Sequence, residues 1–466
     1  MAKTFVIDTN TMVYAPDCLF AFNGDNDIIV PMAALEGLDP LKSRNDISGF
    51  GARESLRILD EARLMGVINK NPVTVQALHK RISEIYKKEN MPIASAPSSS
   101  TGLIRILPDL KPEKTPIIAL NPGVHDDRMI LSTLALKERA GGEVILITKD
   151  AQLRIRAEMA GAKAQDFTRD YVDVSSVYTG YRVLPFEGPE TMESIAQGTH
   201  KDLVDPAPNE FAVVKISESQ YKIAQFKNNI WNWLPDKPKS IFDQKPKPIG
   251  QNMNLEQTLL FFLLNDPDIS YVCVTGAPGT GKSYITLAKG LEDSIEHEKP
   301  LIIMRPLTSA SEEDLGFLPG TYEEKTEPWF SPITDNLSQL IKIKNEKEGG
   351  ADYSLRDLYA DGFARNETLI HLKGRTFVNN TLLLDEGQDT TAFLMRLLAT
   401  RVGIGTRLYI TGDLTQASEK YRLSPYSNGL SFLISRMRGS PHFAHLSLTS
   451  VIRSEAAKIA DERLKF

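Results

Sequence analysis

The chain has 466 residues, of which 54 are Lys or Arg and 60 are Asp or Glu, for a formal net charge of −6. This length is about three times that of a typical ~150-residue domain, so we expect two or three domains. Because no segment forms a basic tail, any nucleic-acid site must be a local patch. The two cysteines, Cys18 and Cys273, exclude a disulfide scaffold and a Cys-based zinc site, and the seven histidines are scattered.

The amino terminus, MAKTFVIDTN, lacks the apolar core and cleavage site of a signal peptide. The longest apolar runs, such as 259–264, are far shorter than the ~20 residues that a membrane helix needs. We therefore expect a soluble, cytoplasmic protein without a membrane partner.

Strands and helices are predicted to alternate in the first part of the chain, which favours a parallel α/β sheet. Proline, serine and glycine are frequent at 92–123, which predicts an insertion loop or hairpin there. The predicted strands are 4–7, 28–30 and 144–148, and the predicted helices are 52–66, 127–140 and 151–160.

The pattern changes after residue 180. Alternating apolar residues in FAVVKIS and YKIAQFK predict a small antiparallel β unit, and the proline- and lysine-rich stretch 235–250 predicts an extended linker. A second α/β pattern then begins, with strands at 271–275, 301–304, 381–384 and 407–411 and helices at 255–264 and 283–291. We predict three parts: 1–180, a β-rich linker region at 181–245, and 246–466.

A full match to the phosphate-loop pattern GxxxxGK[ST] lies between a predicted strand and a predicted helix. The glycines let backbone N–H groups approach phosphate oxygens, Lys282 supplies charge to the β- and γ-phosphates, and the Ser283 hydroxyl can bind Mg²⁺. The helix points its positive dipole end at the anion. The alternative is a glycine-rich turn without a ligand. The matched residues are Gly276, Ala277, Pro278, Gly279, Thr280, Gly281, Lys282 and Ser283.

A magnesium site beside bound phosphates needs a carboxylate at the end of a neighbouring strand, and the run LLLDEGQD supplies it. Asp385 would hold Mg²⁺ through water, and Glu386 would polarise the attacking water. A third strand leads to Gln416 in ITGDLTQ, whose amide could sense the γ-phosphate. The alternatives are a core strand with a capped end for the acidic pair and a polar turn for Gln416.

Five motifs in one order resemble the PhoH-like ATPases over about residues 250–460: GAPGTGKS, RPLTSASEEDLGFLPG, LLLDEGQD, ITGDLTQ and SVIRSE. The resemblance implies ATP as the nucleotide and one RecA-like domain, similar to the first motor domain of superfamily-one helicases. It also implies that Gln257 reads the adenine edge. Arg453 would be an arginine finger for a neighbouring subunit, and Arg375 a sensor or phosphate contact. From chemistry alone, either arginine could instead form a surface ion pair.

Carboxylates also follow the predicted strands of the first part of the chain, at Asp8, Glu36 and Asp150, while Asp126 and Asp127 open a helix. Carboxyl-terminal strand ends of a parallel sheet share one edge. Acids gathered there would need Mg²⁺ or Mn²⁺ between them, and such a site can activate water against a phosphodiester. The alternative is that the strand-end aspartates only cap the next helix.

The words FVIDTN, VPMAALEGLDPLK, HDDRMIL and ITKDAQLRIRA resemble the PIN nuclease family over about residues 3–170. The resemblance implies that Asp8, Glu36, Asp127 and Asp150 bind metal, with Asp8 and Asp150 required for cleavage. One departure concerns Glu36, which is followed by Gly37 and not directly by leucine as in the family. This departure puts nuclease competence in doubt but not the fold.

The whole chain thus resembles a fusion of a PIN domain with a PhoH-like ATPase. The resemblance implies ATP-dependent unwinding of, or translocation on, single-stranded RNA, coupled to metal-dependent cleavage. A lone motor domain cannot alternate its grip on a strand, so we expect a homo-oligomer, such as a ring with Arg453 acting across the interface. The alternative function is a nucleotide-gated RNA-binding regulator whose PIN domain does not cleave.

Overall fold

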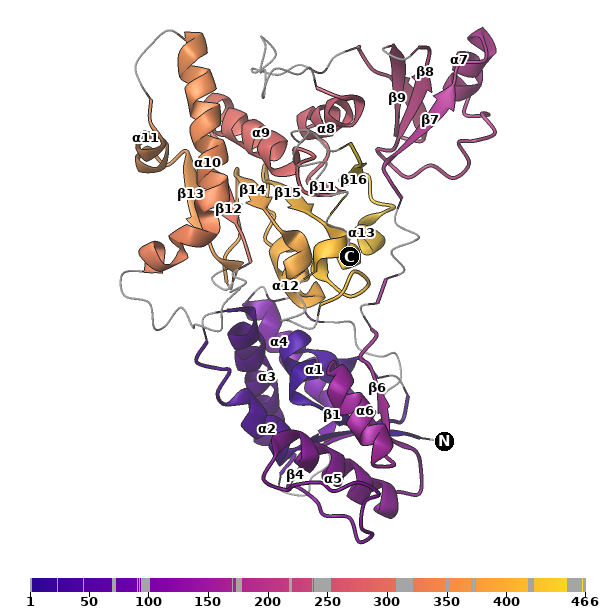
Figure 1. Ribbon diagram of the computed structural model, residues 1–466, viewed down its shortest axis with the longest axis vertical. Coiled ribbons are helices and arrows are strands. Elements are labelled where there is room, and N and C mark those ends of the chain that lie inside the picture. Colours follow the sequence, from indigo (N-terminus) through magenta and orange to yellow (C-terminus); the bar gives the residue numbers. More distant parts are fainter. Residues whose placement is uncertain are drawn as a thin grey trace.

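The computed structural model of the chain describes residues 2–22, 24–44, 46–68, 73–89, 91, 93, 101–169, 171–172, 178–217, 220–236, 238, 253–306, 322–348, 353–369, 372, 374–417, 423–450 and 463. The described residues form three sheets, which follow one another along the chain (Figure 1). Each sheet is built from a different part of the sequence, so the α/β fold class and the succession of two α/β domains around a β-rich unit are confirmed.

The amino-terminal sheet has the strand order β3-β4-β2-β1-β5-β6 and is parallel except for the β3–β4 pair. Its strands are β1 (Thr4–Ile7), β2 (Asp27–Pro31), β3 (Val73–Thr74), β4 (Leu103–Leu107), β5 (Val144–Ile147) and β6 (Lys163–Gln165). The helices are α1 (Thr9–Tyr14), α2 (Met32–Leu38), α3 (Ile47–Leu64), α4 (Val75–Lys88), α5 (His125–Arg139) and α6 (Ala151–Met159), with a 3₁₀ turn at Cys18–Phe20.

The middle sheet has the order β10-β9-β8-β7 and carries one helix, α7 (Pro189–Ala196). Its strands are β7 (Tyr181–Pro185), β8 (Phe211–Lys215), β9 (Tyr221–Lys227) and β10 (Ile230–Trp233). The antiparallel unit predicted for FAVVKIS and YKIAQFK is confirmed, since β8 and β9 pair in this way, while β7, which was not predicted, pairs with β8 in parallel. A crossover that includes α7 joins these two strands, and such a connection returns the chain in the same direction.

The carboxy-terminal sheet is parallel throughout, in the order β13-β12-β14-β15-β11-β16. Its strands are β11 (Tyr271–Gly276), β12 (Leu301–Met304), β13 (Ala364–Glu367), β14 (Thr381–Leu384), β15 (Arg407–Gly412) and β16 (Phe443–Leu448). The helices are α8 (Leu255–Asn265), α9 (Lys282–His297), α10 (Tyr322–Glu348), α11 (Leu355–Ala360), α12 (Ala392–Ala399) and α13 (Gly429–Met437). In Figure 1, α8 and α9 lie above this sheet and α12 and α13 below it.

One correction concerns the stretch 92–123, which was predicted as an insertion loop or hairpin. Part of it is β4, which pairs in parallel with β2 and so belongs to the main sheet. This strand, LIRIL, was missed because prolines and serines surround it and an arginine interrupts its apolar residues. Most of the predicted linker 235–250 lies outside the described residues.

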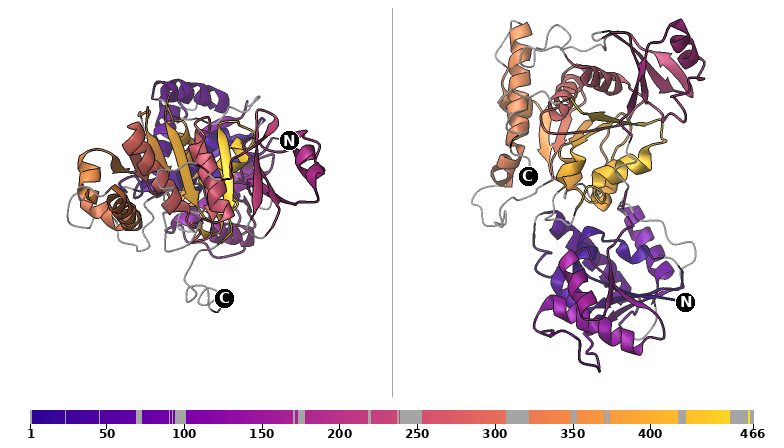
Figure 2. Two further views of the ribbon diagram at one scale, coloured as in Figure 1. Left: turned by 90° about the horizontal axis from the view of Figure 1, so that it is seen from above. Right: turned by 45° about the vertical axis from the view of Figure 1, so that its right-hand side comes forward.

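The amino-terminal domain contacts the α12 and α13 side of the third sheet (Figure 1 and the right-hand view of Figure 2). Buried apolar side chains of the two domains form one cluster, in which the rings of Phe50 and Phe393 lie 6.1 Å apart. This shared apolar core fixes the two domains relative to each other. Of the helices in the described ranges, none is both long and apolar enough to cross a bilayer.

Candidate functional site

The phosphate loop lies between β11 and α9, and its glycines have backbone angles that other residues rarely adopt. Gly276, Gly279 and Gly281 have φ angles of +151°, +84° and +91°. A Cβ atom at Gly276 would lie 2.2 Å from the carbonyl oxygen of Leu448, so a side chain is excluded there. The loop therefore curls tightly over the start of α9.

Lys282 and Ser283, the last residues of the loop, are predicted to contact phosphate and metal. The Lys282 ammonium donates to the carbonyls of Gly276 and Ala277, at 2.6 and 3.0 Å, so it lies folded over the loop. The Ser283 hydroxyl donates to Oδ1 of Asp385 at 2.7 Å. Hydroxyl and carboxylate oxygens are the hard ligands that Mg²⁺ prefers, so this pair fits the ion.

Glu386 follows Asp385 at the end of β14 with a left-handed backbone, at φ +56°. Its carboxylate accepts hydrogen bonds from Gln388 at 2.8 Å and from Arg305 at 3.1 Å. Arg305, which follows β12, also lies 3.6 Å from Asp385. Sequence reasoning missed this arginine, although its place directly after a predicted strand, in the motif beginning RPL, was a usable signal.

The remaining residues predicted to bind nucleotide lie in different surroundings. Gln257 is buried, donates to the Thr280 carbonyl of the phosphate loop at 3.2 Å, and belongs to the capping box of α8. Gln416 lies exposed in a 3₁₀ turn (Leu414–Gln416) after β15, the strand beside β11. Arg375 forms an ion pair of 2.9 Å with Glu367, as the ion-pair alternative expected. Arg453 lies outside the described residues.

At the edge of the amino-terminal sheet, Asp8 is the most buried of the four predicted metal-binding acids, with 1% of its surface exposed. Its Oδ2 accepts from the Thr148 hydroxyl at 2.7 Å and from the Asn10 amide at 3.2 Å, which caps α1. Its Oδ1 is buried and has no hydrogen-bond partner. Burial raises the pKa of the Asp8 carboxyl, and an unpaired buried oxygen fits a cation.

The other three acids are engaged within the chain. Asp150 caps α6, as the capping alternative expected, accepting from the amides of Gln152 and Leu153. Glu36 pairs with Arg128, which lowers the pKa of the Glu36 carboxyl, and Asp127 pairs with Arg156. Across the described ranges no three His, Cys, Asp or Glu side chains are arranged to hold a metal ion. The four acids therefore do not form a metal site together in this arrangement, although the unpartnered Oδ1 of Asp8 fits a cation.

The structure explains the departure at Gly37. A Cβ atom there would lie 2.4 Å from the Thr9 hydroxyl and 2.6 Å from Nε2 of His125. The His125 ring occupies this space, with Nε2 2.6 Å from the Ala33 carbonyl oxygen. His125 was not predicted as part of the site, because Ala33 and Thr9, which it contacts there, lie 92 and 116 residues away in the chain.

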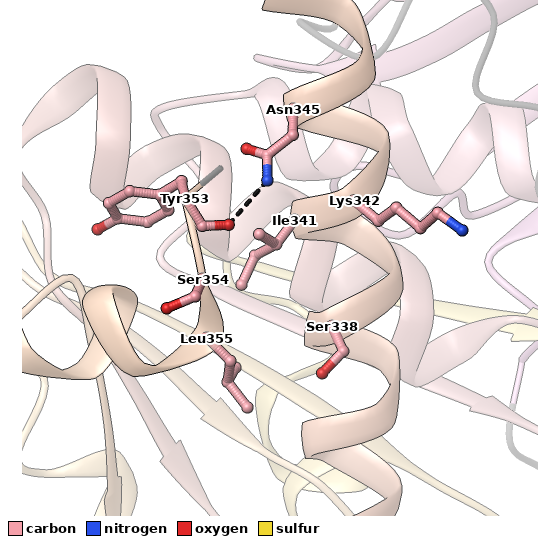
Figure 3. A pocket seen from close by; sticks show the side chains of 7 residues that line it. All are labelled: Ser338, Ile341, Lys342, Asn345, Tyr353, Ser354 and Leu355. Carbon is pink, nitrogen blue, oxygen red and sulfur yellow. Dashed lines mark hydrogen bonds between the residues drawn. The ribbon is translucent and has the colours of Figure 1, made fainter. Parts of the chain in front are cut away.

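Two cavities lie away from the phosphate loop. A cavity of about 430 Å³ opens between α10 and α11 (Figure 3). One of about 570 Å³ lies at the amino-terminal edge of the third sheet, beside Arg407. Neither contains a residue predicted to bind nucleotide or metal.

A parallel sheet that places a phosphate loop beside a strand-end Asp-Glu pair defines a P-loop NTPase. Comparison with known families agrees: a model of the PhoH-like proteins matches residues 251–463, and a PIN-domain model matches 5–168. The chain is 30% identical to Protein PhoH2 of Bacillus subtilis, over the full length of both. It is 25% identical to Protein PhoH2 of Thermobispora bispora, over 99% of this chain and 97% of the relative.

The chain therefore belongs to the PhoH2 family, in which a PIN domain precedes a PhoH-like NTPase domain. Among solved structures it is similar to a Pif1 helicase from Candida albicans, at 15% identity and a TM-score of 0.24, over 46% of this chain and 43% of that one.

Proposed function

We propose that the protein hydrolyses ATP at the phosphate loop and uses the cycle to unwind, or move along, single-stranded RNA in the cytoplasm. The observation that carries the ATPase is the pairing of Ser283 with Asp385 beside Lys282. In bound ATP–Mg²⁺, Ser283 and Asp385 would hold the ion, Lys282 would contact the β- and γ-phosphates, and Glu386 would orient the attacking water. Mg²⁺ there neutralises charge on the phosphates.

The proposal includes a homo-oligomer. The described residues contain one sheet with a phosphate loop, and a single motor domain has no second grip on the strand. A ring in which Arg453 reaches the neighbouring site would supply both the grip and the arginine finger.

We further propose that the PIN domain cleaves the RNA with Mg²⁺ or Mn²⁺. Family membership and the unpartnered Asp8 oxygen support this. The pairs Glu36–Arg128 and Asp127–Arg156 favour a second candidate, a nucleotide-gated RNA-binding regulator whose PIN domain does not cleave. These arginines place positive charge where the family would place metal.

The deciding experiment is cleavage of end-labelled single-stranded RNA with and without ATP, and with Mg²⁺ or Mn²⁺, alongside phosphate release. If the PIN domain cleaves RNA, cleavage should require the metal. Asp8→Asn and Asp150→Asn should each abolish cleavage and keep ATPase activity. RNA binding that responds to ATP, without cleavage by the parent, would establish the second candidate instead. Undiminished cleavage by Asp8→Asn would place the nuclease site elsewhere.

A further inference from the structure

Ser427, in the turn before α13, lies at the boundary between the two α/β domains and contacts both. Its hydroxyl oxygen lies 2.8 Å from the hydroxyl of Tyr14 and accepts a hydrogen bond of 3.2 Å from the Lys149 ammonium. Ser427 is only 1% exposed, and the Lys149 side chain is 5% exposed. Hydrogen bonds to charged groups in such a buried place are strong and costly to leave unmade.

On the PIN side, Lys149 stands in the chain between Thr148 and Asp150, at the end of β5. The Thr148 hydroxyl donates to Asp8 at 2.7 Å. The Lys149 ammonium lies 4.7 Å above the centre of the Tyr14 ring and reaches the Phe167 carbonyl at 3.4 Å. A shift of the Ser427 hydroxyl would therefore act on the segment after β5, which leads into Asp150 and contacts Asp8 through Thr148.

On the ATPase side, the turn that holds Ser427 is fixed to the segment that follows Glu386. The Gly429 amide donates to the Thr390 carbonyl at 2.7 Å. A Cβ atom at Gly429 would lie 2.2 Å from the Thr390 hydroxyl oxygen and 2.8 Å from the Thr391 carbonyl oxygen, so the two segments are in direct contact. Thr390 directly follows the 3₁₀ turn Gly387–Asp389.

The 3₁₀ turn Gly387–Asp389 is also bonded to the candidate ATP site. The Gln388 side chain donates to Glu386 at 2.8 Å and accepts from the Asp413 amide at 3.0 Å. Asp413 follows β15, three residues before Gln416. Any rearrangement of Glu386 around a γ-phosphate thus reaches Gln388, and through the chain Thr390 and the Ser427 turn.

We propose that Ser427 and Lys149 are positioning residues that couple the nucleotide state at Glu386 to the end of β5, where Thr148 contacts Asp8 and Asp150 follows. The contacts are contiguous, buried and close-packed, and packed contacts of this kind transmit displacement. The coupling rests on the proposed function, because it needs ATP to bind at the phosphate loop. It does not need RNA cleavage.

The test is hydrogen exchange followed by mass spectrometry on the full chain, with and without a non-hydrolysable ATP analogue and Mg²⁺. The readout is the peptide that contains Thr148, Lys149 and Asp150. Nucleotide binding should slow its exchange by about fivefold or more, the lower end of ordinary coupling factors. In Ser427→Ala and in Lys149→Met the nucleotide effect should fall to near unity, although nucleotide binding persists.

Ser424→Ala is the matched control, because Ser424 lies in the same turn and its described bonds to Ser427 and Asn428 use its backbone. It should respond to nucleotide as the parent does. An equal nucleotide effect in Ser427→Ala and the parent overturns the role of Ser427. Bound nucleotide that leaves the parent's peptide unchanged overturns the coupling and leaves the ATPase proposal standing. A parent that binds no nucleotide overturns both.

Discussion

Ser283 at the start of α9 and Asp385 at the end of β14 are 102 residues apart in the chain, yet the Ser283 hydroxyl donates a 2.7 Å hydrogen bond to the Asp385 carboxylate. The same carboxylate oxygen accepts a 2.6 Å bond from Thr411 on β15. Three elements of the sheet edge therefore meet at one oxygen. The hydroxyl and the carboxylate that are predicted to hold Mg²⁺ are therefore brought together by the fold itself.

Substitutions at Lys282 and Glu386 should separate nucleotide binding from hydrolysis. Lys282→Ala removes the ammonium group that would contact the β- and γ-phosphates, so we expect loss of both nucleotide binding and hydrolysis. Glu386→Gln keeps the shape but not the water-polarising carboxylate, so binding should persist while turnover falls by about 10² or more. Fluorescent-nucleotide binding and phosphate release measure the two quantities. Unchanged turnover in either variant would contradict the assignment.

Asp8→Asn should stabilise the protein at neutral pH without metal. Burial raises the folded-state pKa of Asp8, so the ionised carboxylate destabilises the fold fully above that pKa. The penalty declines as the pH falls below that pKa and is gone below the ordinary value of 3.8. Asparagine caps helices as well as aspartate does, so α1 should keep its cap. We expect a gain of ~1 kcal/mol in unfolding free energy at pH 7, the scale of an ordinary single substitution.

Thermal unfolding with and without Mn²⁺ provides the control for the Asp8 prediction. Mn²⁺ should stabilise the parent and not Asp8→Asn, because only the parent has an ionised oxygen at position 8. An equal Mn²⁺ effect in both would show that Asp8 does not bind the ion.

Arg156→Gln should increase Mn²⁺ binding to the PIN domain. Arg156 neutralises Asp127, and without it the carboxylate becomes available to a cation. An increase of about tenfold corresponds to roughly 1.4 kcal/mol. Electron paramagnetic resonance of free Mn²⁺ measures the affinity, in a Lys282→Ala background that excludes nucleotide-bound metal. Arg63→Gln is the control, because it removes the same charge from an exposed pair with Asp60. It should change the affinity little, and equal affinities in the two variants would contradict the prediction.

We expect the folded protein to lose stability in mild acid because of the buried His445. Burial lowers the pKa of His445 to about 4 from its ordinary 6.5, so the folded state keeps it neutral while the unfolded chain takes up a proton below pH 6.5. Stability should therefore fall between pH 6.5 and 4, by roughly 3 kcal/mol at most. His445→Gln should lose that part of the pH dependence in urea unfolding at pH 6.5 and 4.5. An identical pH dependence in both proteins would show that His445 does not contribute.

Mixing inactive subunits tests whether Arg453 acts in a neighbouring site. Arg453→Ala and Lys282→Ala should each lack ATPase activity alone. In a mixed ring, some interfaces pair an intact phosphate loop with an intact arginine, so partial activity should return. No recovery, with mixed oligomers demonstrated, would mean that Arg453 acts within its own subunit or has no part in hydrolysis.

Sequence reasoning predicted the phosphate loop and the Asp385–Glu386 pair because their chemistry lies in short contiguous motifs between regular elements. It did not predict Arg305 at Glu386, or Arg128 and Arg156 at the PIN acids, because these contacts depend on strand order and on helix rotation. The strand β4 was missed for a similar reason. Its surroundings are turn-forming residues, and only pairing with β2 makes it a strand.

Glu256, beside Gln257 in the first turn of α8, shows how the chain can be divided. Its carboxylate accepts from the amides of Thr449 and Ser450, each at 2.9 Å, and from the Tyr181 hydroxyl at 2.8 Å. Phe211 and Val213 of the middle sheet also pack in the core of the third sheet. A fragment that begins near residue 246 would lack the Tyr181 hydroxyl that donates to the buried Glu256 carboxylate. It would also expose the apolar surface that Phe211 and Val213 cover. A fragment for studying the PhoH-like domain alone should therefore begin before Tyr181.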